Sequence, residues 1–393
     1  MKKNHPSWLD EIKVAVVYEP LYKMGGGELH LKYILEAFPN SELFTAYYDD
    51  NLVKKNFKNR KINASFLQKL PWRNKLRYIY LLFLPMAYKS FRFKDFDVII
   101  SLSSHFAKFA NQKGVQHIDI CMTPPKFLWQ KEDRTLKKKS QLSGINKFFF
   151  GIYSFFMDTA LEDVWRKWDK EAAQKCDRIV AISNVVKKRV EEYYGVNADV
   201  IYPPVEVSKI AKYPRVNRKE NWFLYLGRVE KYKGVHLAIK ACNKLDLPLK
   251  IAGTGDDLEA MKQLVDKLAA KGIVKFLGYV SEDEKYELLS RAKALIFPVR
   301  GEDFGIVPVE ANAFGTPVIA YKDGGPTETI SLENPATGVF FEKYTVESLV
   351  NVLKKFKPEK YTQDNCIKQS QNFASEIFIY KLQNYVKDTL QIH

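Results

Sequence analysis

The stretch from Pro298 to Gly325, P-V-R-G-E-D-F-G-I-V-P-V-E-A-N-A-F-G-T-P-V-I-A-Y-K-D-G-G, decides the fold of this chain. The apolar run just before it, Ala294 to Phe297, is typical of a buried strand that ends at Pro298. Pro308 stands where the first turn of a helix tolerates proline, and Gly315 ends that helix. The apolar residues after Pro317 form the next strand. A strand, a loop, a helix and a strand in this order predict a parallel α/β sheet.

Two acidic residues stand where open α/β sheets bind their ligands. Glu302 lies in the loop beyond the carboxyl end of the first strand, and Glu310 lies in the first turn of the helix. Phe304 and Gly305 place backbone N–H groups just ahead of this helix, whose positive dipole end favours an anion. The stretch therefore predicts a phosphate site with two carboxylates beside it.

These two carboxylates would repel a phosphate if they faced it. A neutral polyol on either side of the phosphates removes the conflict, because its hydroxyls donate hydrogen bonds to carboxylates. A nucleotide sugar carries such hydroxyls on its ribose at one end and on its sugar at the other. In the alternative interpretation, Glu302 and Glu310 are solvated acids of a loop and of a helix start.

The block E-D-F-G-I-V-P-V-E-A, followed by G-T-P-V-I-A, resembles the E-x7-E motif of the large retaining glycosyltransferase family 4, which has the GT-B fold. The resemblance extends over nearly the whole chain. It implies that Glu310 holds the ribose of the donor. It also implies that Glu302 and the backbone from Phe304 through Gly305 to Ile306 hold the transferred sugar.

Length and composition are those of a globular protein with more than one domain. The chain has 393 residues, 46% of them hydrophobic and 27% charged. The start of the chain lacks the apolar core of a secretory signal, and the apolar run from Tyr78 to Tyr88 is too short to span a bilayer. We therefore expect a cytoplasmic protein. Its four cysteines have no metal-ligand spacing, which also favours a reducing compartment: Cys121, Cys176, Cys242 and Cys366.

The formal net charge of +16 requires an anionic partner. No sequence motif of a nucleic-acid-binding protein is present, so we expect no nucleic acid partner. Two regions mix basic with aromatic residues, one from Phe66 to Lys94 and one from Lys137 to Phe156. Both suit an anionic membrane surface, which predicts peripheral attachment to the inner face of the cell membrane. The alternative is that they form core helices with basic rims.

The first half opens with a strand from Ile12 to Tyr18, a glycine-rich turn and a helix. Glycine lets the backbone approach a phosphate closely, although the turn lacks the G-x-G-x-x-G spacing of a dinucleotide site. By resemblance, the G-G-x-E text that begins with Gly25 and Gly26 matches the family's loop beside the donor phosphates. The text from Ala37 to Asp49 resembles that of bacterial polysaccharide mannosyltransferases. The alternative for the glycines is a tight turn with a helix start.

His105 follows the strand that runs from Val98 to Leu102, on the side of the sheet where sites are built. The family places an active-site histidine after the equivalent strand, near sugar and acceptor, and His105 matches it. Relatives commonly carry a second histidine where this chain has Met122. The D-x-D sequence from Asp95 to Asp97 precedes the strand, at its amino end, and is interpreted as a solvated turn. We therefore expect no metal site.

The second half restarts the α/β alternation after Pro203 and Pro204. A strand from Trp222 to Leu226 leads into G-R-V-E-K-Y-K-G-V, in which Arg228 and Lys233 can neutralise a diphosphate. Taken alone, they could be two surface cations of a basic protein. Their spacing matches the diphosphate-binding arginine and lysine of the family. Gly253, after the next strand, corresponds to a turn near the nucleotide.

The sequence therefore predicts the GT-B fold, α/β in class, with two doubly wound Rossmann-like domains. We expect an acceptor-side domain over residues 1–205, a nucleotide-sugar domain over 206–375, and a helix over 376–393 that returns to the first. The predicted enzyme is a retaining, metal-independent hexosyltransferase without a cofactor, with His105, Glu302, Arg228 and Lys233 as its catalytic residues.

The first choice of reaction is the transfer of mannose from GDP-mannose to a lipid-linked saccharide in cell-surface polysaccharide assembly. This choice of donor rests on the resemblance. One alternative is a UDP-sugar donor with a soluble or glycolipid acceptor. Another is a sugar-nucleotide-binding protein without catalysis.

Overall fold

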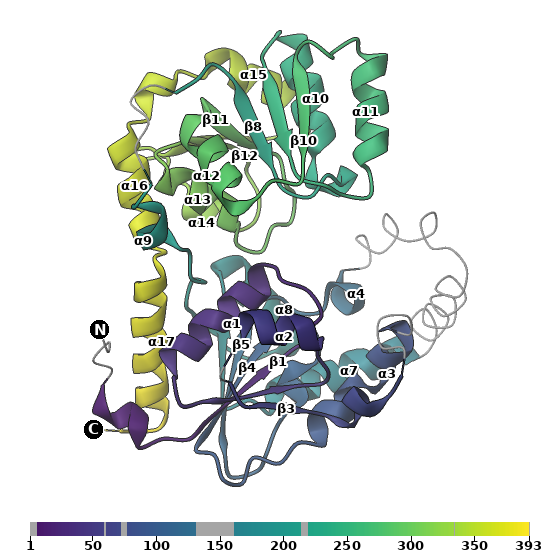
Figure 1. The fold of residues 1–393 in the computed structure, drawn as a ribbon, viewed down its shortest axis with the longest axis vertical. Helices are drawn as coiled ribbons and strands as arrows, with labels where there is room; N and C mark the ends of the chain where they lie inside the picture. The colour runs from purple at the N-terminus through teal and green to yellow at the C-terminus, as the bar shows by residue number, and fades with distance from the viewer. Residues whose placement is uncertain are drawn as a thin grey trace. The chain divides into compact units, whose positions relative to one another are not determined.

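A computed structural model of the chain describes residues 6–58, 60–71, 77–130, 161–213, 219–333 and 335–392. The chain forms two compact units (Figure 1). The first unit combines Met1–Tyr202 with Phe378–His393, and the second unit is Pro203–Ile377. Each unit is built on one parallel sheet, which confirms the predicted α/β class.

The sheet of the first unit has the strand order β3-β2-β1-β4-β5-β6-β7. Strand β1 is buried along its whole length and pairs with β2 on one side and β4 on the other. The strand order therefore reverses between β1 and β4, which is where such sheets bind ligands. The strands are β1 (Val14–Tyr18), β2 (Glu42–Thr45), β3 (Ile62–Ala64), β4 (Val98–Ser103), β5 (Gln116–Cys121), β6 (Arg178–Ala181) and β7 (Asp199–Val200).

Helices connect and cover these strands: α1 (Gly26–Ala37), α2 (Asp50–Asn56), α3 (Arg77–Lys89), α4 (Lys126–Trp129), α7 (Leu161–Gln174) and α8 (Asn184–Tyr194). Short 3₁₀ turns add η1 (Ser7–Asp10), η2 (Phe66–Lys69) and η3 (Ala107–Phe109). The last helix, α17 (Ser375–Thr389), begins in the second unit and ends in the first. There the ring of Phe378 packs edge-on against His30, with the ring centroids 4.8 Å apart.

The sheet of the second unit has the order β10-β9-β8-β11-β12-β13 and reverses between β8 and β11. Its strands are β8 (Phe223–Leu226), β9 (Leu249–Ala252), β10 (Val274–Gly278), β11 (Ala294–Phe297), β12 (Val318–Tyr321) and β13 (Gly338–Phe341). Its helices are α9 (Val207–Ile210), α10 (Val235–Lys244), α11 (Leu258–Lys267), α12 (Glu282–Arg291), α13 (Ile306–Ala313), α14 (Pro326–Thr329), α15 (Val346–Lys355) and α16 (Gln363–Gln371). The 3₁₀ turns η4 (Lys231–Lys233) and η5 (Pro358–Lys360) complete it.

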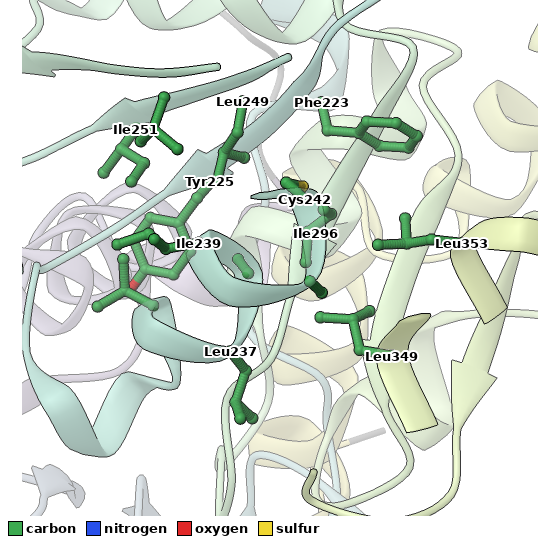
Figure 2. Close-up of a cluster of buried hydrophobic side chains, with 14 of the residues drawn as sticks. Phe223, Tyr225, Leu237, Ile239, Cys242, Leu249, Ile251, Ile296, Leu349 and Leu353 are labelled. Atoms are coloured by element: carbon green, nitrogen blue, oxygen red, sulfur yellow. The ribbon is translucent and has the colours of Figure 1, made fainter. Parts of the chain in front are cut away.

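The core of the second unit fixes the strands that carry its loops. Tyr225 of β8 and Ile251 of β9 pack against Ile239 of α10, and Leu349 of α15 closes the same cluster (Figure 2). Burying one such side chain contributes about 1.5–3 kcal/mol. The carboxyl ends of β8 and β11 are thereby held side by side, and the loops that follow them start from fixed points.

Candidate functional site

The predicted donor residues of the second unit follow two neighbouring strands. Arg228 and Lys233 come after β8, and Glu302 comes after β11. Because β8 and β11 pair in parallel, their carboxyl ends lie at the same edge of the sheet. The structure therefore brings these loops together at the point where the strand order reverses.

Glycine allows the loops to approach this closely. Gly234 has a φ of 75°, and a Cβ on it would lie 2.1 Å from the carbonyl oxygen of Pro298 at the end of β11. Gly253 has a φ of 131°, and a Cβ there would lie 2.0 Å from the carbonyl oxygen of Gly227. Only glycine fits such positions without a backbone shift. Gly253 thus serves the packing of the loop beside Arg228.

The ammonium of Lys233 and the carboxylate of Glu302 form an ion pair. Lys233 Nζ lies 2.7 Å from Glu302 Oε2, and the two side chains are 21% and 22% exposed. The Glu302 loop is held by Gly325, whose N–H donates to the Glu302 carbonyl at 2.8 Å. The two residues therefore form one partly exposed site, with the lysine on β8's loop and the glutamate on β11's loop.

Glu310 also has a lysine of its own. It lies in α13, is buried, and receives a hydrogen bond from Lys285 of α12, whose Nζ lies 2.7 Å from Glu310 Oε1. Burial raises the pKa of Glu310, and the nearby Lys285 ammonium opposes this. Glu310 is therefore not a solvated helix-start acid. Lys285 was missed at the sequence level, because its place opposite Glu310 depends on how α12 packs on α13.

The start of α13 offers backbone N–H groups rather than side chains. Gly305 stands at its N-cap with a φ of 90°, and no side chain caps the helix. The N–H groups of a first helical turn have no partner inside the helix, so a ligand anion can accept from those around Ile306. The ring of Phe304 is buried and packs on Phe373 at 5.6 Å, so Phe304 can serve a ligand only through its backbone.

Arg228 is the most exposed of these groups, and its guanidinium pairs with a residue of its own loop. Its side chain is 61% exposed, and Nη1 donates to Glu230 at 2.8 Å. The centroid of the Tyr232 ring is 5.8 Å from the Arg228 guanidinium and 5.4 Å from Lys233 Nζ, and the Tyr232 hydroxyl accepts a hydrogen bond from Arg228. Tyr232 was also missed by the sequence reasoning, which considered only the two cations of this loop.

The first unit presents a second group of predicted residues at the switch between β1 and β4. His105 follows β4, is half-buried, and stacks on Phe127 with the rings 19° apart in orientation. Its Nδ1 lies 2.8 Å from the hydroxyl of Ser104. Gly25 and Gly26 follow β1, where Gly25 is the N-cap of α1 and no side chain caps that helix.

Glu19, just after β1, holds the turn that carries His105. Its Oε1 accepts hydrogen bonds from four consecutive backbone N–H groups, those of residues 104, 105, 106 and 107, at 3.2, 2.8, 2.9 and 3.2 Å. Its Oε2 is buried and has no hydrogen-bond partner among the residues that the structure describes. Glu19 was missed from the sequence, where it is only an acid between Tyr18 and Pro20.

Tyr18 and Met122 flank the glycine turn. A Cβ on Gly27 would lie 2.6 Å from the Tyr18 hydroxyl and 3.4 Å from the sulfur of Met122. The Tyr18 hydroxyl interacts with Glu28. The pKa of Tyr18 is raised far above its usual range, mainly by burial and next by the Glu28 carboxylate. A thioether thus occupies the place beside the glycine turn where the resemblance leads one to expect an imidazole.

Comparison with known proteins identifies the family. The family described as "Glycosyltransferase Family 4" matches residues 24–209, and "Glycosyl transferases group 1" matches residues 207–373. Together the two matches run from residue 24 to residue 373. The chain is a glycosyltransferase of the GT4 type. The family predicted from the sequence is thereby confirmed.

Curated relatives of this glycosyltransferase include two enzymes with named activities. The O-antigen chain mannosyltransferase RfbU of Salmonella typhimurium is 32% identical over 173 residues, which are 42% of this chain and 48% of that protein. The D-rhamnosyltransferase WbpZ of Pseudomonas aeruginosa is 30% identical over 214 residues, 49% of this chain and 53% of that protein. The chain spans about half the length of these relatives.

A solved structure has the same fold over nearly the whole chain. The sucrose-phosphate synthase of Thermosynechococcus elongatus superimposes with a TM-score of 0.74 and 17% identity, covering 97% of this chain and 100% of that one. At this identity the likeness concerns the fold alone. It confirms the predicted GT-B fold with two Rossmann-like domains.

Two other sequence expectations concern metal and membrane. Within the described ranges, no three metal-ligating side chains gather into a cluster. Asp97 of the D-x-D sequence accepts a hydrogen bond from the Lys13 backbone at 2.8 Å, in an exposed turn before β4. No helix in the described part of the chain is both long and apolar enough to cross a bilayer. The basic–aromatic region from Lys137 to Phe156, and Arg73 and Lys75 of the first region, lie outside the described residues.

Proposed function

We propose that this glycosyltransferase transfers mannose from GDP-mannose, with retention and without a metal or cofactor, to a lipid-linked saccharide in cell-surface polysaccharide assembly. The observation that carries the proposal is the pairing of each motif carboxylate with a lysine, Glu302 with Lys233 and Glu310 with Lys285, beside the uncapped start of α13. The choice of mannose is supported by the relatives that transfer mannose and D-rhamnose.

The ion pairs explain how carboxylates can lie beside a diphosphate. A lysine ammonium has three donors, so Lys233 can keep its bond to Glu302 while a second N–H binds a phosphate oxygen. The exposed Arg228 side chain exchanges its bonds to Glu230 and Tyr232 for bonds to the phosphates. Charge on the departing diphosphate is then stabilised by these two cations and by the N–H groups of α13, which is the role a metal has in other transferases.

The two motif carboxylates then bind hydroxyl groups of the donor. Glu302 accepts from the transferred sugar and Glu310 from the ribose, each with an oxygen that its lysine does not occupy. His105, held by the Glu19 turn, contacts the sugar or the acceptor near the reacting carbon. The acceptor hydroxyl attacks the face that the diphosphate leaves, through an oxocarbenium-like transition state. Its proton passes to the leaving phosphate oxygen.

The acceptor is proposed to reside at the inner face of the cell membrane, where this protein binds peripherally from the cytoplasm. The net charge of +16 supports attraction to anionic lipid. Helix α3 supports it as well, because Tyr80, Leu84 and Tyr88 are buried while Phe83 and Met86 are 43% and 61% exposed. The helix thus has both a core face and an apolar outer face.

A thermal-shift panel of GDP-, UDP- and ADP-sugars and their free diphosphates tests the donor. A ligand that binds only the folded protein raises the melting temperature according to its affinity. We expect GDP and GDP-mannose to stabilise the protein and the other nucleotides to leave it unchanged. Stabilisation by UDP compounds alone would contradict GDP-mannose as the donor and would still agree with a glycosyltransferase. No shift with any nucleotide would favour a different function.

A further inference from the structure

A cavity of about 350 Å³ lies in the first unit, between α3, η3 and α7. Its walls include three lysines, two aromatic rings and one carboxylate: Lys89, Lys108, Lys175, Phe109, Trp168 and Glu171. The lining residue Asn111 donates to the Lys175 carbonyl at 2.9 Å and lies 3.3 Å from His117 Nδ1, at the amino end of β5. The site around His105 lies at the opposite, carboxyl end of the strands. The cavity is therefore separate from the proposed reaction site.

Two of the three lysines are available to an anion. Lys108 is fully buried, and its Nζ pairs with Asp169 at 2.8 Å and donates to the His105 carbonyl at 2.9 Å. Lys89, by contrast, has its Nζ over the rings of Phe109 and Trp168, 5.4 and 5.7 Å from their centroids. Among the residues that the structure describes, no carboxylate forms an ion pair with Lys89 or Lys175. The cavity thus offers two lysine side chains without an ion pair, beside aromatic rings and the Glu171 carboxylate.

Exposed apolar side chains lie on both helices, within one turn of residues that line the cavity. Met86 stands one turn before Lys89 on α3 and is 61% exposed. On α7, Val164 and Trp168 are spaced by one turn and are 39% and 44% exposed. Figure 1 shows α3 and α7 side by side, and the contact of Lys89 with Trp168 joins them. Apolar side chains next to unpaired cations are the pattern of a surface that enters a lipid interface.

We propose that this cavity binds the phosphodiester headgroup of an anionic membrane phospholipid. The inference rests on the membrane association proposed above and gives it a defined site. Lys89 and Lys175 bind the phosphate, Glu171 accepts a hydrogen bond from a headgroup hydroxyl such as those of glycerol, and Trp168 lies at the level of the headgroups. Met86 and Val164 contact the acyl chains. The shared chemistry, a phosphate ester, could also come from a soluble molecule, and the experiment separates the two sources.

Vesicle sedimentation at low salt tests the proposal with the full-length protein. The vesicles contain phosphatidylcholine alone or phosphatidylcholine mixed with phosphatidylglycerol. The test variant is Lys89→Ala/Lys175→Ala, and the matched control is Lys54→Ala/Lys55→Ala, which removes the same charge from the exposed last turn of α2. Near an anionic surface each lysine contributes about 1 kcal/mol, so the test variant should bind phosphatidylglycerol vesicles about thirtyfold more weakly than the wild type. The control should bind within about threefold of the wild type.

The outcomes separate the cavity from the wider membrane proposal. If wild-type protein ignores phosphatidylglycerol vesicles, the membrane association itself is wrong. If the wild type binds and both double variants weaken equally, net charge accounts for the binding and the headgroup site is refuted. GDP-mannose stabilisation of the test variant, measured by thermal shift, should match that of the wild type and so shows that the variant is folded.

Tryptophan quenching gives a readout that does not depend on the net charge of the protein. Vesicles of phosphatidylglycerol with brominated acyl chains should quench part of the wild-type fluorescence, and the quenched part should disappear in Trp168→Phe. Quenching that persists unchanged in this variant would place another tryptophan at the lipid and contradict the proposal. Soluble glycerol phosphate should not raise the melting temperature. A clear shift, lost in Lys89→Ala/Lys175→Ala, would reassign the cavity to soluble phosphate esters.

Discussion

Lys233 Nζ lies 2.7 Å from Glu302 Oε2, so the cation expected to bind the donor diphosphate is already bonded to the carboxylate expected to bind the donor sugar. Each partner neutralises the charge of the other. This removes the repulsion that an isolated carboxylate would exert on an incoming phosphate. It also ties the position of one ligand-binding group to that of the other.

Replacing Lys233 with alanine should therefore remove a donor from the diphosphate and leave Glu302 unpaired. Loss of one charge-stabilising donor costs about 10²–10³ in turnover, and the unpaired carboxylate adds repulsion. We expect Lys233→Ala to lower transferase turnover by at least this factor. Lys231→Ala, two residues away and exposed, serves as the control and should keep wild-type turnover. Equal turnover in both variants would contradict the role of Lys233.

Glu302→Gln should separate sugar binding from diphosphate binding. The amide keeps the shape of the side chain but loses the charge that strengthens hydrogen bonds from sugar hydroxyls. Calorimetric titration should show weaker binding of GDP-mannose, by about tenfold, while the affinity for GDP stays equal or rises. If both ligands weaken in parallel, Glu302 acts through the phosphates or the fold, and its assignment to the sugar is incorrect.

Glu19→Ala should loosen the turn that carries His105. The carboxylate oxygen accepts from four backbone N–H groups, and hydrogen bonds to charged groups contribute about 1.5–3 kcal/mol. We expect urea unfolding of the variant to show a loss of about 3 kcal/mol. Glu19→Gln should recover part of this loss.

Glu42→Ala breaks a partly exposed ion pair with Lys61 and is the control, expected to cost less than about 1 kcal/mol. The groups proposed to hold the donor nucleotide lie mainly in the second unit, so we expect GDP binding to survive in Glu19→Ala. A stability loss no larger than that of Glu42→Ala would show that Glu19 does not hold the turn.

His30 should make the protein sensitive to acid. Burial lowers its pKa from the usual 6.5 to about 3. The unfolded chain therefore binds a proton below pH 6.5 that the folded protein does not, and stability falls by about 1.4 kcal/mol for each pH unit between 6.5 and 3. In His30→Leu this contribution disappears. Between pH 6.5 and 5 the free energy of unfolding should therefore fall by about 2 kcal/mol less in the variant than in the wild type.

Both proteins in this comparison keep the other buried titrating groups. These include His117, whose pKa burial lowers to about 3, Asp119, whose pKa burial raises to about 6, and Glu310, whose pKa burial also raises. The difference in pH dependence therefore isolates His30. Parallel curves for wild type and His30→Leu would show that the histidine is not held neutral in the fold.

The sequence alone predicts the sheets and the loops that follow their strands, because these depend on local patterns. The apolar run of β11 and its Pro298 stop place Glu302 at a carboxyl end, and the run of β8 does the same for Lys233. The sequence does not show that these loops touch. That depends on the pairing of β8 with β11 and on the close approach that Gly234 permits.

Contacts between elements distant in sequence could not be predicted. Lys285 meets Glu310 only because α12 packs on α13, and Glu19 meets the residues around His105 only because β1 pairs with β4. The run of α3 is apolar on all sides, so its sequence does not indicate which side faces outward. The structure shows that Tyr88 is in the core and Met86 is exposed. Polar partners and exposed faces are properties of packing, not of local sequence.

The most direct test of the central claim is calorimetric titration of GDP-mannose into the wild type and into Lys233→Ala. We predict one saturable site on the wild type and binding at least about tenfold weaker in the variant, because the diphosphate loses a charged donor. Equal affinity in the two proteins, or a wild type that binds no nucleotide sugar of any base, would contradict it.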